Sequence, residues 1–449
     1  MNPVNRLNQE INGISIAIFR IGFGLFMIWE ILYLMRIDFV NVFLINPKVQ
    51  LYYEFIPFLK PLPKAMMDVL IVGLLIASIL ITIGKYYRKA MIFFCIGFTY
   101  IFLLDKAYYN NHLYLVCLLS FLFIFIPADH KLSLTKKESG QVNPVRHWHL
   151  LILKIQLVLV YFFGGIAKLN SDWLVSKQPT LTILSNKAQD SIFGSFLTSD
   201  FMTYFVTYGG LVFDLCIGFF LFIPRFRIIA IIAALFFNIT NAWLFDDINI
   251  FPYMMIIALV LFLDPHKIAS YVNKKLFDKR TYIPKKTDTL FPIKKPILIG
   301  LSIYIFIQFV LPLRHVLFPG NTEWTGHGQR FAWRMKIQYR QVDTLEFKVW
   351  DIKKKIIYPI DYRSYGMNQD QINALGYYPK TAVQFAKFLK NHSLTNKGMD
   401  TVQVRSRLKV SLNGRPAQYI FDKDVDVASL KIAPFDTENW VTTLNDIEK

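Results

Sequence analysis

The stretch WHLLILKIQLVLVYFFGGIAK, residues 148–168, decides the fold class of this chain. Within the run only Lys154 carries a full charge before Lys168 ends it. As a helix, a run of this length reaches about 30 Å, the thickness of the hydrocarbon core of a bilayer. The stretch therefore predicts a membrane-spanning helix that ends at a lysine.

The whole chain shares this apolar character. Of its 449 residues 54% are hydrophobic, and the mean hydropathy is +0.36, which is too apolar for a soluble protein of this length. The net charge of +19 lies mostly in loops, so it does not indicate a nucleic-acid partner. The cysteines Cys95, Cys117 and Cys216 fall inside apolar runs, where we expect no disulfide, and no pattern of metal ligands is apparent.

Apolar runs bounded by charge or proline predict about nine transmembrane helices. They lie near residues 13–35, 66–84, 90–105, 112–127, 148–168, 203–223, 226–245, 249–264 and 294–313. We therefore expect an α-helical polytopic membrane domain with the catalytic residues over residues 1–313.

Loop charges predict the orientation of these helices, because basic residues stay on the cytoplasmic side. Basic segments follow alternate spans: KYYRK at 85, PRFR at 224 and the stretch 274–295, whereas the acidic DDIN at 246 lies in an opposite loop. This pattern places the N-terminus in the cytoplasm and residues 314–449 outside, across a bacterial cell membrane or in the lumen of the endoplasmic reticulum.

The segment after residue 314 has a different periodicity. LEFKVWDIKKKIIYPID (345–361) and DTVQVRSRLKVSLNGRPAQYIFD (400–422) alternate in period 2, as strands do. Asn413 and Gly414 form the favoured pair for a tight hairpin turn, and PKTAVQFAKFLKNH (379–392) predicts an amphipathic helix opened by a proline. We expect a β-rich extracytoplasmic substrate domain over residues 314–449.

Ionisable side chains inside the predicted spans need a partner or a function, since each costs at least about 2.5 to 3.5 kcal/mol at mid-span. Arg20 and Asp214 fall at similar depths, and we interpret them as an ion pair between the first and sixth spans. Glu30 lies nearer the outer side, and its position is compatible with either a structural or a catalytic role.

Lys168 has the most informative neighbours. In a helix it shares one face with Tyr161, Gly164 and Gly165, so the two glycines leave a slot for a flat ring with Tyr161 as its floor. The alternative is that the glycines let another helix approach, while Lys168 extends to the interface or pairs with Asp172. Other polar residues are predicted at the same level, near the outer interface: Asn110, Asn111, His112, Asn238, Asn241 and Trp243.

Five motifs in order resemble the vitamin K-dependent gamma-glutamyl carboxylases, within the horizontally transferred transmembrane domain (HTTM) proteins. They are VYFFGGIAKLNSDW (160–173), LDKAYYNNHLYL (104–115), EWTGHGQRFAWRM (323–335), VSLNGRPAQYIFDKDVDV (410–427) and APFDTENWV (433–441). The similarity covers roughly residues 13 to 445.

The resemblance implies an enzyme that oxidises vitamin K hydroquinone (phylloquinol or menaquinol) with O2 to the 2,3-epoxide. This oxidation drives carboxylation of a glutamate-containing protein or peptide with CO2. Lys168 would match the catalytic base, Asn111 the residue that holds the hydroquinone, and His112 a residue of the carboxylation step.

The same resemblance and the predicted depths assign binding residues. Tyr161, Gly164, Gly165, Asn241 and Trp243 would bind the cofactor, and Trp324, Trp333 and Arg340 the substrate. Gln329 and Gln338 stand where the family usually has a tyrosine and a histidine, so quinone chemistry is expected to match the family more closely than the outer substrate site.

Two other functions fit the same residues. One is a quinone epoxidase that does not carboxylate protein, and the other is a lipid or quinone carrier or transporter in which the polar cluster only binds. The absence of matching interrupted spans in two halves argues against an inverted-repeat transporter.

Overall fold

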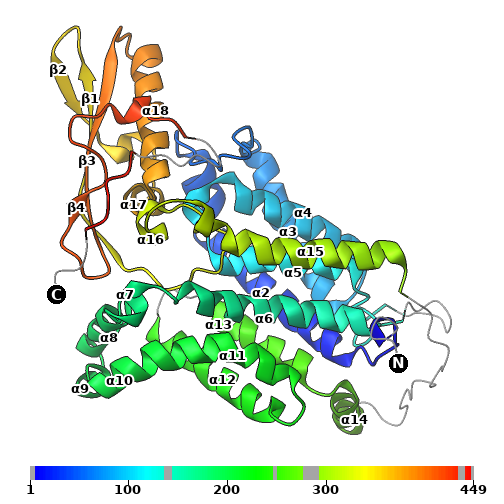
Figure 1. The fold of residues 1–449 in the computed structure, drawn as a ribbon. Coiled ribbons are helices and arrows are strands. Elements are labelled where there is room, and N and C mark those ends of the chain that lie inside the picture. Colours follow the sequence, from blue (N-terminus) through cyan, green and yellow to red (C-terminus); the bar gives the residue numbers. More distant parts are fainter. Residues whose placement is uncertain (1–5, 136–143, 246–249, 277–292, 433–439, 446–449) are drawn as a thin grey trace.

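The structure is a computed structural model that describes residues 6–135, 144–245, 250–276, 293–432 and 440–445 (Figure 1). A bundle of long helices is followed by a C-terminal region with a small sheet, which confirms the predicted class of a multi-pass helical membrane protein. The acidic loop at 246 and most of the basic stretch 274–295 lie outside the described residues.

Seven of the nine predicted spans are helices long and apolar enough to cross a membrane. They are α2 (Ile14–Arg36), α3 (Lys64–Ile83), α4 (Tyr87–Leu104), α6 (His147–Ala167), the path Asp200–Phe222 that joins α10 (Asp200–Tyr204) to α11 (Gly210–Phe222), α12 (Arg227–Leu244) and α15 (Lys295–Leu313).

The other two predicted spans are shorter. The helix α5 (Asn111–Phe125) has 15 residues, and α13 (Phe251–Ala258) continues to Phe262 before the chain bends by 99° into α14 (Pro265–Leu276). If the bent pair counts as one span, up to eight helices cross the membrane among the described residues, rather than about nine.

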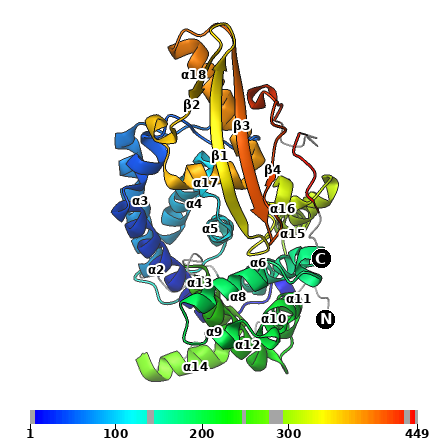
Figure 2. The ribbon, with the colours of Figure 1, turned by 90° about the vertical axis from the view of Figure 1, so that its left-hand side faces the viewer.

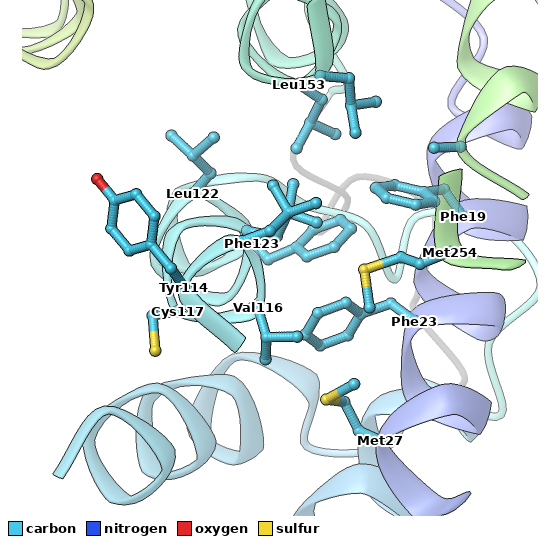
Figure 3. Packing of buried hydrophobic residues seen from close by; sticks show 14 of the residues in the cluster. Phe19, Phe23, Met27, Tyr114, Val116, Cys117, Leu122, Phe123, Leu153 and Met254 are labelled. Carbon is cyan, nitrogen blue, oxygen red and sulfur yellow. The ribbon is translucent and has the colours of Figure 1, made fainter. Parts of the chain in front are cut away.

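Aromatic side chains fill the centre of the bundle (Figure 3). Phe23 of α2 lies 5.5 Å from Phe123 of α5 and 5.9 Å from Phe94 of α4, measured between ring centroids, and Met254 of α13 packs beside them. Because α5 is buried in this core, its N-terminal end is held at a fixed place between α4 and α6.

Short helices connect the spans and the sheet at the outer end of the bundle. They are α7 (Ser171–Leu174), α8 (Thr180–Gln189), α9 (Gly194–Leu197) and α16 (Thr322–Thr325) (Figure 1). Between α10 and α11 the chain forms a π-helical turn, Phe205–Gly209.

The C-terminal sheet has four antiparallel strands in the order β2-β1-β3-β4. They are β1 (Arg340–Asp351), β2 (Ile356–Pro359), β3 (Val402–Leu412) and β4 (Gln418–Tyr419), and the predicted helix is α18 (Pro379–Asn396), preceded by α17 (Gln369–Tyr377). Both residues of the predicted hairpin turn have positive φ, 51° at Asn413 and 78° at Gly414, as the tight turn requires. Figure 2 shows the lower ends of β1 and β3 beside α6 and α8.

The segment after α2 packs with both parts of the molecule: Phe39, Val40 and Leu44 belong to the core of the bundle, whereas the residues from Val49 on pack with the C-terminal region. Val49 and Leu51 belong to the same buried cluster as Phe347 of β1. Gln371 of α17 donates hydrogen bonds to the Val49 carbonyl (3.1 Å) and to Asp105 (2.9 Å). These contacts fix the sheet against the outer end of the helices.

The predicted ion pair between Arg20 and Asp214 is wrong. The Arg20 guanidinium donates to backbone carbonyls, including those of Ala128 (3.1 Å) and Thr82 (3.2 Å), and so holds together the ends of neighbouring helices. Glu30 is buried in α2, and no ion pair to it occurs in the described part of the chain.

Candidate functional site

A cavity of about 780 Å³ lies where α5, α6, α11 and α12 meet the start of β1. Its size is within the range of about 300 to 1,000 Å³ that small-molecule sites occupy. Six of the residues predicted for the site line it: Asn111, His112, Tyr161, Lys168, Asn241 and Arg340. Helices and a strand distant in sequence thus converge on one space.

Lys168 forms a buried ion pair with Asp214 inside this cavity. Lys168 is the C-cap residue of α6 and Asp214 lies in the middle of α11, and the two side chains are 11% and 7% exposed. The Lys168 ammonium also lies 3.4 Å from the Gly164 carbonyl oxygen and 5.2 Å from the centre of the Trp173 ring. The candidate base therefore has a carboxylate partner inside the cavity.

Asp172 does not pair with Lys168, in contrast to the alternative drawn from its spacing. Its carboxylate accepts hydrogen bonds from Asn413, which lies in the hairpin turn of the sheet, and from Arg415, which follows that turn.

The two glycines before Lys168 have different surroundings. A Cβ atom at Gly165 would lie 2.8 Å from the side chain of Leu215 and 3.0 Å from its backbone nitrogen, so Gly165 allows α11 to approach α6. The predicted ring slot is therefore wrong at Gly165. A Cβ atom at Gly164 would lie 3.5 Å from the Asp214 carboxylate, so this glycine leaves room beside the ion pair.

Tyr161 is one wall of the cavity, and its hydroxyl accepts a hydrogen bond from Asn238 of α12 (2.9 Å). Asn241, one turn further along α12, lines the cavity itself. Val160 and Phe237 add apolar surface to the same lining.

Asn111 and His112 enter the cavity from the first turn of α5. The helix is capped by Asn110, whose side chain accepts from the His112 backbone N–H (3.5 Å), so Asn111 does not cap it. The Tyr109 hydroxyl donates to the Asn111 side-chain oxygen (2.9 Å) and accepts from the Phe331 N–H (2.6 Å). This chain of contacts ties Asn111 to the segment that leads to the sheet.

The outer end of the cavity is basic. Four cations line it, Lys187, Arg334, Lys336 and Arg340, with the acidic Asp190. Sequence reasoning missed Arg334 and Lys336 although both lie in or beside the recognised segment EWTGHGQRFAWRM, because no periodicity in that irregular stretch shows which side chains face inward.

Arg340 contacts protein groups as well as the cavity. Its guanidinium donates to the backbone carbonyls of Glu323 and Trp324, and burial lowers its pKa to about 10. Arg334 is similarly paired with the Glu323 carboxylate, at 2.8 Å from Nε. Both arginines therefore hold α16 in place at the mouth of the cavity.

Several predicted site residues lie away from the cavity surface. Among the described residues, its lining does not include Gly164, Gly165, Trp243, Trp324 or Trp333.

The three tryptophans have other surroundings. Trp243 is 43% exposed, whereas Trp324 is buried and donates from its ring nitrogen to the Thr442 carbonyl (2.7 Å). Trp333 is fully buried and packs against Tyr114, with ring centroids 5.0 Å apart. Trp324 and Trp333 thus anchor the segment between α15 and β1.

The two departures from the family pattern also differ in position. Gln338 lines the cavity, and its buried side-chain oxygen has no hydrogen-bond partner among the described residues. Gln329 is buried elsewhere.

Two family models match the chain. The HTTM domain matches residues 8–266, and the lumenal domain of vitamin K-dependent gamma-carboxylase matches residues 293–447. No solved structure matches the chain.

Proposed function

Because the chain belongs to the vitamin K-dependent gamma-glutamyl carboxylase family, we propose that it oxidises reduced vitamin K with O2 to the 2,3-epoxide. We further propose that it couples this reaction to carboxylation of glutamate in a protein or peptide. The name of the matched lumenal domain suggests that residues 293–447 lie on the extracytoplasmic side, with the N-terminus in the cytoplasm as the loop charges predict.

The observation that carries the proposal is the continuity of the cavity. Lys168, Asn111 and His112 of the helical domain line the same cavity as Arg334 and Arg340 of the segment that leads into the sheet. A ring bound beside the first group and an acidic side chain entering beside the second would therefore meet in the same space.

The membrane end fits an apolar ring with hydroxyl groups. Val160, Tyr161 and Phe237 provide flat apolar walls, and the polar groups of Lys168 and Asn111 are available to its hydroxyls. When bound, reduced vitamin K supplies, on reaction with O2, a base strong enough to remove a γ-proton from glutamate.

The residues of the chain would bind, orient and move protons. Lys168, in its amine form, accepts a proton from a ring hydroxyl, and Asn111 holds the ring next to it. His112, at the start of α5, faces the cavity where CO2 would add to the glutamate carbanion. The apolar walls exclude water, which would otherwise quench a strong base.

At the outer end, Arg334, Lys336 and Arg340 would attract the carboxylate of the substrate. Arg340 also holds α16 through backbone carbonyls, so it would shape the mouth of the cavity as well as contribute charge.

A second function is favoured by two observations at the outer end. The guanidiniums of Arg334 and Arg340 already have partners within the protein, and Gln338 replaces a histidine of the family pattern. This arrangement favours epoxidation without efficient carboxylation of short peptides.

Purified protein incubated with menaquinol, O2, labelled bicarbonate and a glutamyl peptide tests both functions. Epoxide together with label fixed in the peptide supports the carboxylase, and epoxide alone supports the second function. Binding of menaquinol without any epoxide would overturn both and support a carrier.

A further inference from the structure

We propose that Asp214 is a proton acceptor that works with Lys168 as one acid–base unit. In this unit Lys168 passes its proton to Asp214 and takes a proton from a ring hydroxyl in the cavity. The inference rests on the proposed function only in that the ligand carries an acidic ring hydroxyl.

The geometry gives Asp214 a single partner. Its Oδ2 accepts from the Lys168 ammonium, and no other hydrogen bond to this carboxylate occurs in the described part of the chain. Both residues line the cavity, so the second proton of the unit can come from a bound ligand.

The step conserves protons, because each bond that breaks is matched by one that forms. The O–H bond of the ring hydroxyl breaks and an N–H bond forms at Lys168, while another N–H bond of Lys168 breaks and an O–H bond forms at Asp214. The ammonium is regenerated, the carboxylate becomes a neutral acid, and the ring oxygen becomes an anion beside the ammonium.

The number of charges in the site is therefore the same before and after the step. The negative charge moves from Asp214 to the ring oxygen, and Lys168 stays between them as the cation. If the lysine acted alone as a neutral amine, the transfer would create two charges from two neutral groups in an apolar cavity, which is costly where the dielectric constant is low. The carboxylate thus lowers the energy of the ionised ligand.

A purely structural role for Asp214 makes a different prediction. If Asp214 only positioned or neutralised the lysine, a bound hydroxyl would still ionise without it, because an unpaired ammonium favours the ring anion. The protonation state of a bound ligand is therefore the quantity to measure.

The test uses 2-methyl-1-naphthol, a ring with one hydroxyl that is neutral when free at pH 7. Its affinity and the absorption band of its ionised form are measured with wild-type protein and with Asp214→Asn, Asp214→Glu and Lys168→Arg. We expect the ionised band with wild type and Asp214→Glu, and its loss with Asp214→Asn at unchanged affinity.

Lys168→Arg keeps the ion pair but replaces the amine with a guanidinium that does not give up its proton. It is expected to bind the naphthol in its neutral form. This variant decides the question if Asp214→Asn does not fold, because it preserves the charges of the site.

Ionisation by Asp214→Asn equal to that of wild type would overturn the proposal, and so would ionisation by Lys168→Arg, which would show direct transfer to the carboxylate. Binding to wild type without ionisation would also overturn it while leaving the ring site intact. Failure of wild type to bind the naphthol at all would instead count against the proposed function.

Discussion

Asp172 binds Arg415 through both oxygens of its carboxylate, at 2.6 Å and 2.8 Å from the two terminal guanidinium nitrogens. Asp172 lies in α7, four residues after Lys168, and Arg415 lies just after the hairpin turn between β3 and β4. Both side chains are buried. The pair therefore links the sheet directly to the end of the helix that carries the candidate base.

Replacing Arg415 with alanine should destabilise the contact between the sheet and the helices. The change leaves the Asp172 carboxylate buried with one fewer partner, which costs about 3 to 5 kcal/mol for a buried pair. Thermal unfolding in detergent measures the effect. Lys353→Ala removes a solvent-exposed pair with Asp400 and should leave the melting temperature unchanged; equal shifts in the two variants would show that the buried pair has no special role.

Lys168→Met should leave the protein folded while lowering epoxide formation from reduced vitamin K by at least about a hundredfold, the lower range for loss of a general base. Lys154→Met is the matched control, because Lys154 lies on the same helix next to Phe262 and does not line the cavity. Epoxide yield per folded protein is the measurement. Normal yield from Lys168→Met would remove this lysine from the mechanism.

Gly165→Ala should disturb the packing of α6 against α11 rather than ligand binding. The new methyl group would overlap Leu215, and overpacking of this kind costs about 1 to 3 kcal/mol. Gly300→Ala in α15, where a Cβ atom meets nothing within 4 Å, is the control. The melting temperatures of the two variants are compared, and an unchanged value for Gly165→Ala with weaker quinone binding would instead support the ring slot.

Arg340→Ala should reduce carboxylation more than epoxidation, because it removes charge and support at the outer end of the cavity while leaving Lys168 and Asp214 in place. His112→Ala is expected to behave similarly if it serves the CO2 step. Epoxide and fixed label are measured in one reaction, with Arg407→Ala on the exposed side of β3 as the control. Equal losses of both products would place these residues in the shared quinone step.

Asp105 should give the protein a pH-dependent stability. Burial raises the pKa of this carboxyl from 3.8 to about 6, despite hydrogen bonds from the Ala107 and Leu51 backbones and from Gln371. The folded state then holds the proton more tightly than the unfolded state, so stability from this group is present at low pH and is lost as pH rises through about 6.

The measurement is the melting temperature of wild type minus that of Asp105→Asn. This difference should fall from pH 4 to pH 7, because only wild type titrates at the position. A difference that is constant over this interval would contradict the assignment.

Local chemistry in the sequence was enough to predict much of the fold. Runs of apolar residues predict spans because the bilayer penalises every unpaired polar group, and seven of these runs are long apolar helices in the structure. The hairpin at Asn413 and Gly414 and the helix that begins at Pro379 were also predicted, since both depend on the backbone preferences of a few adjacent residues.

The partners of the charged residues depended on tertiary structure. Asp214 was assigned to Arg20 from its depth, but in the structure it pairs with Lys168 at the end of α6. Hydropathy shows that a helix spans a membrane but not how far it slides along its neighbour, so it does not determine which charges meet.

The sequence by itself determined the class of the fold, the position of Lys168 at the end of its helix and the family resemblance of its motifs. The tertiary structure decided that Lys168 pairs with Asp214 and that Leu215 occupies the space beside Gly165. It also decided that Arg340 donates hydrogen bonds to backbone carbonyls beside a basic cavity mouth. The physical reason is that secondary structure follows from neighbouring residues, whereas ion pairs and cavities depend on the rotation and offset of whole elements against one another.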